Sequence, residues 1–264
     1  MRYILTLLIA ALASIPSAAG AEADAPVQVL LVSGQNNHNW RATTPKIKSI
    51  LEDSGRFQVE VTEQPEKLDD EALKAFDVIV SNWNCWGKEN EDRNKWSDAT
   101  KRAYLDFVRA GGGHVVVHAG SSSFPSWKEY HELTLATWKL GQTGHGPRHE
   151  FPVRIDKADH PITQGLTDFT IFDELWNRPG IQEGVTLLAS SFSSKEHGGT
   201  GEHEPAAMVK SFGKGRSYTL MLGHGVEEMN NPGFVALLVR GTEWAATGRV
   251  TVTRSNKSTL PSVN

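Results

Sequence analysis

The sequence predicts an α/β fold built on a flavodoxin-like, doubly wound and mainly parallel sheet with helices on both faces. Val115, Val116 and Val117 form an apolar run without alternation, which is typical of a strand covered on both faces. Strand and helix patterns alternate from residue 27 to residue 118. Successive strands lie about 20 to 40 residues apart, which leaves room for a crossover helix between parallel neighbours.

The first half of the chain provides four expected strands, at 27–32, 57–61, 77–81 and around 115–117. Helices are expected between them, because each interval begins with a capping residue. The expected N-caps are Thr44 for the first helix, Asp69 or Asp70 for the second and Ser97 for the third. Pro45 then falls in the first turn of its helix, and Gly55 ends that helix.

The second half is less regular. We expect a short helix around 127–133, a loop that ends at Glu150, alternating strand residues from 151 to 155, and a strand at 185–189. Residues 190–204 read as a loop rich in Ser, Gly and His. A hairpin at 206–210 and 217–222 turns across Gly213-Lys214-Gly215. The last helix begins after Asn231-Pro232 and ends at Gly248.

Residues 1–21 have the pattern of a cleaved secretory signal peptide. Arg2 precedes an apolar run at 4–12, which is followed by small residues up to Ala21. The run is too short for a comfortable transmembrane span, so no stable membrane insertion is expected. We expect a secreted or periplasmic protein with one α/β domain at 22–250 and a mobile tail at 251–264.

Charge and cysteine content exclude some classes of protein. The formal net charge is −4, without the basic stripe that a nucleic-acid partner would require. Cys85 is the single cysteine, so no internal disulfide can form.

Four predicted strands end in polar or aromatic residues that point to one shared pocket. Ligands bind outside the carboxyl ends of the strands in open α/β sheets. The residues at these ends are His38 and Trp40 after the first strand, Asn82 and Trp83 after the third, His118 after the central strand, and His224 after the last. The alternative for His118 is a structural one, in which it only ends the strand and bonds a neighbouring loop.

Two further segments carry candidate chemistry. Glu174 lies beside Trp176, and an aromatic neighbour can tune a carboxyl group for acid–base work; a solvated acidic turn is the alternative. His145 and His149 have the spacing of a metal-binding pair, although Pro147 argues against a helix between them. As loop ligands they would hold a divalent metal, zinc or similar, in a site that His118 or Glu174 completes.

Eight tryptophans suggest a carbohydrate ligand. Most fall in or beside predicted loops, among Asn, His, Asp and Glu. Indole rings offer apolar faces and a polar N–H, which suit a sugar ring. We expect Trp40, Trp83 and Trp176 to form a platform for such a ring, while other loop tryptophans pack against helices.

Several segments in chain order resemble the trehalose-utilisation (ThuA-like) family. These are Val115-Val116-Val117-His118-Ala119-Gly120, His160-Pro161-Ile162-Thr163-Gln164-Gly165-Leu166, Asp173-Glu174, and Gly213-Lys214-Gly215-Arg216 leading to Leu222-Gly223-His224. The resemblance runs from about residue 27 to residue 248. It implies a class I glutamine amidotransferase-like fold and a link to trehalose and related, oxidised glycosides. Glutamine hydrolysis is not expected, because the elbow position holds His118 and no cysteine.

The leading hypothesis is an exported enzyme that acts on a glycoside or keto-sugar by acid–base chemistry, with metal assistance. His118 is the expected base or ligand and Glu174 its carboxylate partner. His38, Trp40, Asn82, Trp83, Trp176 and His224 are the expected substrate contacts, and His145 and His149 the expected metal ligands. Two alternatives remain open: a non-catalytic carbohydrate-binding protein, and an amidase or esterase that uses Ser121 or Ser122.

Overall fold

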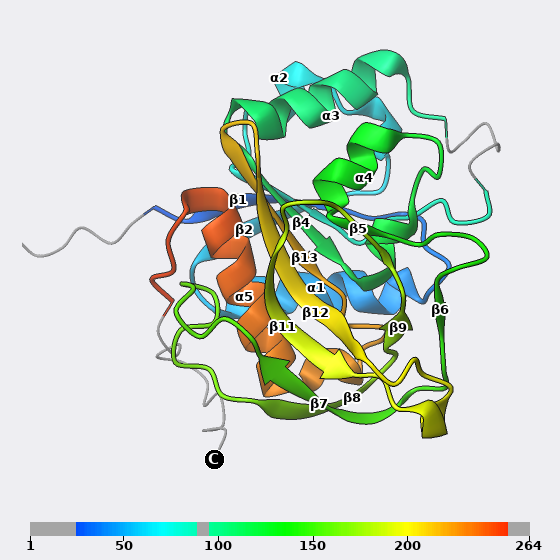
Figure 1. Cartoon of the computed structure of the whole chain (residues 1–264). Helices are drawn as coiled ribbons and strands as arrows, with labels where there is room; N and C mark the ends of the chain where they lie inside the picture. The colour runs from blue at the N-terminus through cyan, green and yellow to red at the C-terminus, as the bar shows by residue number, and fades with distance from the viewer. Residues whose placement is uncertain (1–24, 89–94, 253–264) are drawn as a thin grey trace, which may run out of the picture.

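A nine-stranded sheet runs through the centre of the molecule (Figure 1). The computed structural model describes residues 25–88 and 95–252. Five neighbouring strands are parallel, in the order β2 (Phe57–Thr62), β1 (Val27–Val32), β3 (Val78–Ser81), β4 (Gly113–Val117) and β13 (Gly215–Leu220). Beyond β13 the sheet continues antiparallel through β12 (His203–Phe212), β11 (Thr186–Phe192), β7 (His149–Ile155) and β8 (Phe169–Asp173). The predicted doubly wound, mainly parallel fold class is confirmed.

Helices cover both faces of the parallel strands and create two apolar cores (Figure 1). The long helices α1 (Trp40–Asp53) and α5 (Pro232–Thr247) pack on one face, where Val115 and Val117 of β4 join their core. The helices α2 (Asp70–Leu73), α3 (Asp98–Ala110) and α4 (Lys128–Thr134) lie on the other face. An uninterrupted valine run in β4 is therefore required, because side chains of both orientations are buried.

Short elements complete the carboxyl edge of the sheet. Two small antiparallel sheets pair β5 (Ala136–Thr137) with β10 (Gly180–Ile181), and β6 (Gly144–His145) with β9 (Trp176–Asn177). Single 3-10 turns are found at η1 (Pro65–Lys67), η3 (His118–Ser122), η4 (Lys195–His197) and η5 (Glu228–Asn230). The β6–β9 pair and η3 bring the middle of the chain over the end of β4.

Most predicted helix caps are confirmed, and the first is wrong. Ser97, Asp69 and Asn231 each accept a backbone N–H at the start of their helices. α1 instead begins about one turn before Thr44, because the N–H groups of the first turn already bond the carbonyl of Asn39. The Thr44 hydroxyl lies 2.6 Å from Ser33 Oγ and ties the helix to the end of β1.

The strands of the second half extend further than the sequence predicts. β11 continues to Phe192 and β12 begins at His203, so the expected loop at 190–204 is shorter. Several residues at the ends of β11 and β12 are buried when the strands pair. This burial outweighs the preference of a Ser- and Gly-rich segment for a loop. β8 was not predicted, because its buried residues alternate with exposed ones over only five positions.

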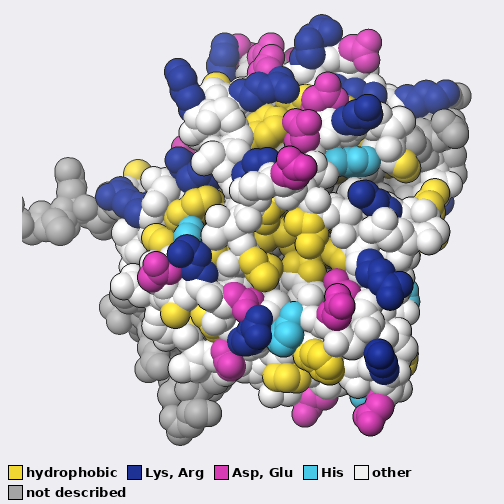
Figure 2. Space-filling view, in the orientation of Figure 1, with side chains coloured by type: hydrophobic (Ala, Val, Ile, Leu, Met, Phe, Trp, Pro, Cys, Tyr) yellow, Lys and Arg dark blue, Asp and Glu magenta, His cyan; other side chains and the backbone are white. Residues whose placement is uncertain are grey.

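Two predictions fall wholly or largely outside the described residues. They are the signal peptide at 1–21 and the tail at 251–264. Within the described ranges, no helix has the length and apolar character needed to cross a bilayer. On the face shown in Figure 2, basic and acidic side chains are mixed around a central apolar group, without a continuous basic stripe.

His114 in β4 makes the stability of the fold depend on pH. The side chain is fully buried, with Nε2 at 3.1 Å from Tyr104 Oη, and burial lowers the pKa of His114 to about 3. In the unfolded chain the imidazole titrates near its ordinary value. Stability is therefore fully present above about pH 6.5 and is lost as the pH falls below it, because only the unfolded chain takes up the proton.

We expect this one histidine to cost about 2 kcal/mol of unfolding free energy between pH 7 and pH 5. Urea unfolding of the wild type and of His114→Gln at both pH values measures it. The pH-dependent loss should be smaller by that amount in His114→Gln, whereas His203→Gln, at an exposed position, should behave as wild type. Equal losses in all three proteins would contradict the prediction.

Candidate functional site

His118 stands at a sharp turn directly after the central strand. It is the first residue of η3 and has φ 45°, a left-handed conformation that is rare for a residue with a side chain. The turn packs closely on β3, since a Cβ on Gly120 would lie 2.7 Å from the carbonyl oxygen of Ser81. The strained backbone directs the imidazole across the carboxyl edge of the sheet.

Three histidines from separate strand ends meet at this edge. The His38 ring, from the loop between β1 and α1, lies 5.0 Å from the His118 ring and 4.4 Å from that of His224, measured between centroids. The rings of His118 and His224 are 5.5 Å apart. All three ring pairs meet edge to face. The structure therefore brings together histidines that are up to 186 residues apart in the chain, between His38 and His224.

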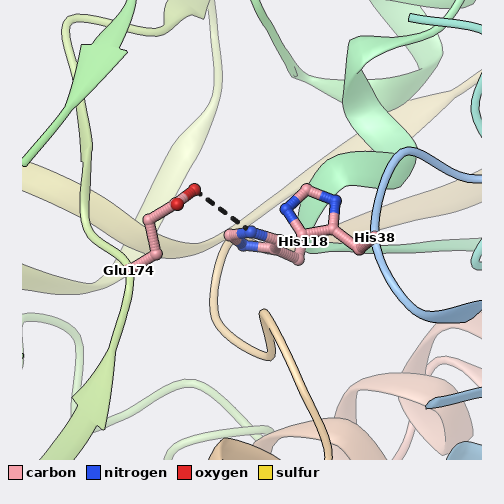
Figure 3. A group of neighbouring side chains, drawn as sticks. All are labelled: His38, His118 and Glu174. Atoms are coloured by element: carbon pink, nitrogen blue, oxygen red, sulfur yellow. Dashed lines mark ion pairs between the residues drawn. The ribbon is translucent and has the colours of Figure 1, made fainter. Parts of the chain in front are cut away.

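Glu174 supplies a negative charge to the cluster. One of its carboxylate oxygens contacts buried side chains, and the other contacts partly exposed ones. Oε1 accepts the indole N–H of Trp176 at 3.1 Å and lies 3.5 Å from His118 Nε2 (Figure 3). Oε2 lies 3.2 Å from His145 Nδ1 and 3.6 Å from His224 Nε2. His118 is buried, whereas the side chains of His145 and His224 are 43% and 28% exposed. The outer oxygen is thus linked to the two imidazoles that solvent and a ligand can reach.

Asp173, the last residue of β8, fastens two loops of the site together. Its buried carboxylate accepts the backbone N–H groups of Glu174 (2.8 Å), Gly223 (2.7 Å) and His224 (3.2 Å). Gly223 has φ 100°, a conformation that favours glycine. Asp173 therefore positions both Glu174 and His224 through their backbone.

The pKa values in the cluster follow from burial and mutual charge. Burial, helped by the imidazoles of His118 and His224, lowers the pKa of His38 to about 3. Burial alone would lower the pKa of His118, but the carboxylates of Glu174 and Asp173 outweigh it and raise that pKa. Burial alone would raise the pKa of Glu174, but the nearby imidazoles, His118 above all, lower it to about 2. Burial raises the pKa of Asp173 to about 6 and lowers that of His224.

The predicted metal pair does not form. His145 reaches Glu174 from β6, but His149 begins β7 and stacks on His197 with ring centroids 4.0 Å apart. The intervening Gly146 and Pro147 keep the segment extended, so the two side chains do not share a helical face. Over 25–88 and 95–252, the one group of three residues with metal-ligand spacing is instead His38, His118 and Glu174, with ligand atoms within 4.8 Å of one another.

The predicted tryptophan platform is wrong in part. Trp83 is 4% exposed and stacks on Phe124 in the core beneath α3 and α4, because its strand end is covered by that layer. Trp176 is 3% exposed and serves Glu174 as a donor instead of offering a ring face. Trp40 begins α1 and stacks with the guanidinium of Arg41 at 4.2 Å.

Asn82 is also structural. It is buried, and its Nδ2 donates to the hydroxyls of Thr43 (2.9 Å) and Thr44 (3.0 Å), so it joins β3 to α1.

The alternative of an amidase or esterase that uses Ser121 or Ser122 receives no support from the structure. Ser121 and Ser122 donate to the backbone carbonyls of His118 and Ala119, and neither hydroxyl is paired with an imidazole among the contacts of the described chain.

Sequence reasoning missed four residues around the site. Trp138 lies with its ring 5.9 Å from that of His145 and 5.0 Å from that of Trp176, and Trp86, 39% exposed, meets Trp138 at 6.2 Å. Asn36 and Asn84 hold His38, through Asn36 Oδ1 at 3.1 Å from His38 Nδ1 and Asn84 Nδ2 at 2.9 Å from Asn36 Oδ1. For Asn36 and Asn84, the only indication in the sequence is that they lie in the loops that follow β1 and β3.

Comparisons with known proteins agree with the fold. The chain matches the family described as "ThuA: Trehalose utilisation" over residues 28–245. The structure of a ThuA-like protein from Parabacteroides merdae is similar at 31% identity and a TM-score of 0.75, covering 86% of this chain and 92% of that one. One from Bacteroides uniformis has 20% identity and a TM-score of 0.66, over 89% and 98% of the two chains.

A more distant likeness concerns the fold alone. A cold-adapted β-galactosidase from Rahnella sp. R3 has 15% identity and a TM-score of 0.54, and the alignment covers 82% of this chain but 31% of that enzyme. No curated protein matches the chain in sequence.

The Asp173 contacts predict a large stability effect. Asp173→Ala leaves three backbone N–H groups without their acceptor in a buried place, so we expect a loss of about 3 kcal/mol or more in urea unfolding. Asp168→Ala is the matched control, because this exposed carboxylate accepts the single N–H of Ile155 at 2.8 Å. If Asp173→Ala costs no more than Asp168→Ala, Asp173 does not fasten the loops.

Proposed function

Because this chain belongs to the ThuA family, whose description is trehalose utilisation, we propose that it is an enzyme acting on a glycoside or keto-sugar by acid–base chemistry. One observation carries the proposal. Glu174 Oε2 lies between the two half-exposed imidazoles, at 3.2 Å from His145 Nδ1 and 3.6 Å from His224 Nε2.

Two imidazoles joined by one carboxylate oxygen suit a reaction that moves a proton. His224 is neutral at pH 7, because burial lowers its pKa, so it accepts a proton from a carbon beside a carbonyl. His145, 3.2 Å from the same oxygen, donates the second proton, to the carbonyl oxygen in an isomerisation or to the oxygen of the leaving group in an elimination. The product is an isomerised or eliminated sugar. His118, whose Nε2 is inaccessible to solvent, acts on this pair through Glu174.

The rim of the site supports a sugar as substrate. Trp138 lies beside His145, Trp86 lies beside Trp138, and both indoles are partly exposed. An indole face covers the apolar face of a pyranose ring, while imidazole and carboxylate groups bond its hydroxyls. We also propose that the protein is exported, on the strength of Arg2, the apolar run at 4–12 and the small residues that follow.

The test is proton exchange. Glycosides and their keto derivatives are incubated with the protein in D2O, and loss of carbon-bound protons is followed by NMR. We expect exchange or turnover that falls by about 100-fold or more in His224→Ala and in Glu174→Gln, the effect of removing a positioned base or its partner. His203→Ala is the control and should keep full rate, because this exposed histidine contacts Ser190 and Arg154 and none of the site residues.

Trp138→Ala separates catalysis from binding. For an enzyme it should raise KM more than it lowers kcat, because the indole contacts the sugar and not the reacting atoms. A protein that binds sugar through Trp138 but shows no exchange with any keto-sugar is the non-catalytic binding protein, and that result overturns the proposal.

A further inference from the structure

We propose that His38, His118 and Glu174 form a binding site for a divalent transition-metal ion of the Zn²⁺ class. One ligand atom from each residue lies within 4.8 Å of the others, and Figure 3 shows the His118 ring between the Glu174 carboxylate and the His38 ring. The residues come from three separate strand ends, so no local turn forces them together. Two imidazoles and one carboxylate are the donors of many catalytic metal centres that keep a position open for substrate.

His118 Nε2 is the observation that favours a ligand there. The atom is buried and has no hydrogen-bond partner, with Glu174 Oε1 at the ion-pair distance of 3.5 Å. Buried polar atoms are nearly always paired, so an unpaired one inside a polar cluster calls for a missing partner. A cation that replaces the proton on this nitrogen supplies that partner.

The tautomer of His118 is set for metal binding. Its Nδ1 lies 2.7 Å from the carbonyl oxygen of Met221, which can only accept, so Nδ1 carries the hydrogen. The lone pair of the neutral ring is then on Nε2, which faces Glu174. A histidine that ligates a metal through one nitrogen usually donates the other N–H to an oxygen in this manner.

The tautomer of His38 is set by a chain of two amides. Asn84 has one possible orientation, because its Oδ1 accepts the N–H of Trp86 (3.2 Å) and its Nδ2 donates to the carbonyl of Ala119 (3.1 Å). The same Nδ2 donates to Asn36 Oδ1 at 2.9 Å, so Asn36 presents its oxygen and not its nitrogen. That oxygen lies 3.1 Å from His38 Nδ1 and leaves the Nε2 lone pair of His38 free.

One of the three ligand-atom distances already fits a bound metal ion, and the other two are at most 4.8 Å. Ligand atoms about 2.1 Å from a tetrahedral metal lie roughly 3.4 Å from one another. His118 Nε2 and Glu174 Oε1 already have nearly that separation, at 3.5 Å. The indole N–H of Trp176 at 3.1 Å fixes the carboxylate from behind. His224, partly exposed, lies next to the group, with its ring 4.4 Å from that of His38 and its Nε2 3.6 Å from Glu174 Oε2.

A metal at this point would polarise a carbonyl or hydroxyl oxygen of a bound ligand. The inference goes beyond the proposed function and does not require it, because metal binding is measured without a substrate. The full chain is purified, freed of metal with a chelator, and titrated with Zn²⁺ by calorimetry and with Co²⁺ by visible absorption.

We expect one equivalent of Zn²⁺ to bind, and Co²⁺ to give the visible bands of a site with four or five ligands. His38→Ala and Glu174→Gln should each weaken Zn²⁺ binding by more than about 100-fold. His149→Ala is the matched control, a histidine that the sequence suggested as a ligand but the structure places on His197. It should bind Zn²⁺ as the wild type does. Circular dichroism confirms that each variant is folded.

The amide chain provides a second, independent measurement. Asn36→Ala removes the acceptor for His38 Nδ1 and should weaken Zn²⁺ binding by about 10- to 100-fold, whereas Asn36→Asp keeps an acceptor oxygen and should restore most of the affinity. The ¹⁵N shifts of the His38 ring in the metal-free protein should report the Nδ1–H tautomer.

Three results would overturn the proposal. They are a folded wild type that binds no Zn²⁺ at one-to-one stoichiometry, binding that survives both His38→Ala and Glu174→Gln, and binding that depends on His149. None of these results decides the carbohydrate chemistry, since proton exchange is measured separately.

Discussion

Two adjacent carboxylates, Asp173 and Glu174, are buried at the carboxyl edge of the sheet, and a buried negative charge persists only where donors surround it. Asp173 takes three backbone N–H groups, and Glu174 takes an indole N–H and has three imidazole nitrogens within 3.6 Å of its oxygens. The donors come from β6, β9 and the segments after β4 and β13. Solvating this pair of charges therefore requires distant loops to meet, and the site is the result.

The sharp turn after the central strand β4 holds His118. In other α/β enzymes a turn of this kind can hold a catalytic nucleophile. His118 adopts a left-handed backbone conformation after β4, and strained turns of this kind are kept where a side chain must be aimed. Cys85, the single cysteine, is buried beside the backbone of Phe124 in the aromatic core and is not at the turn. The turn after the central strand therefore presents an imidazole and not a thiol.

Polar groups next to the charged cluster fix the orientation of the His118 and His38 rings. Met221 O fixes one imidazole, and Asn36 and Asn84 fix another. These bonds link the loops after β1, β3 and β13, whose strands are held by apolar cores on both faces of the sheet. Because packed cores resist small displacements, they hold the site residues in nearly fixed positions before any ligand arrives.

The sequence by itself determined the fold class and the order of elements in the parallel half, because strand patterns and capping residues are local. Ser97, Asp69 and Asn231 begin their helices as their neighbours in sequence require. It also pointed to His38, His118 and His224 at strand ends, since topology alone carries such residues to one edge. Thr44 is the exception, because Asn39 closes the first turn of α1 before it.

Only the tertiary structure decided which of these side chains face one another. Trp83 follows a strand end as His118 does, yet the layer of α3 and α4 buries it, and no local pattern in the sequence distinguishes the two. His149 has the spacing of a ligand, but the extended chain of β7 carries it to His197. Trp138, Asn36 and Asn84 gain their roles from contacts across the loops. Spacing fixes where a residue lies along its element, whereas burial and partners depend on elements far away in the chain.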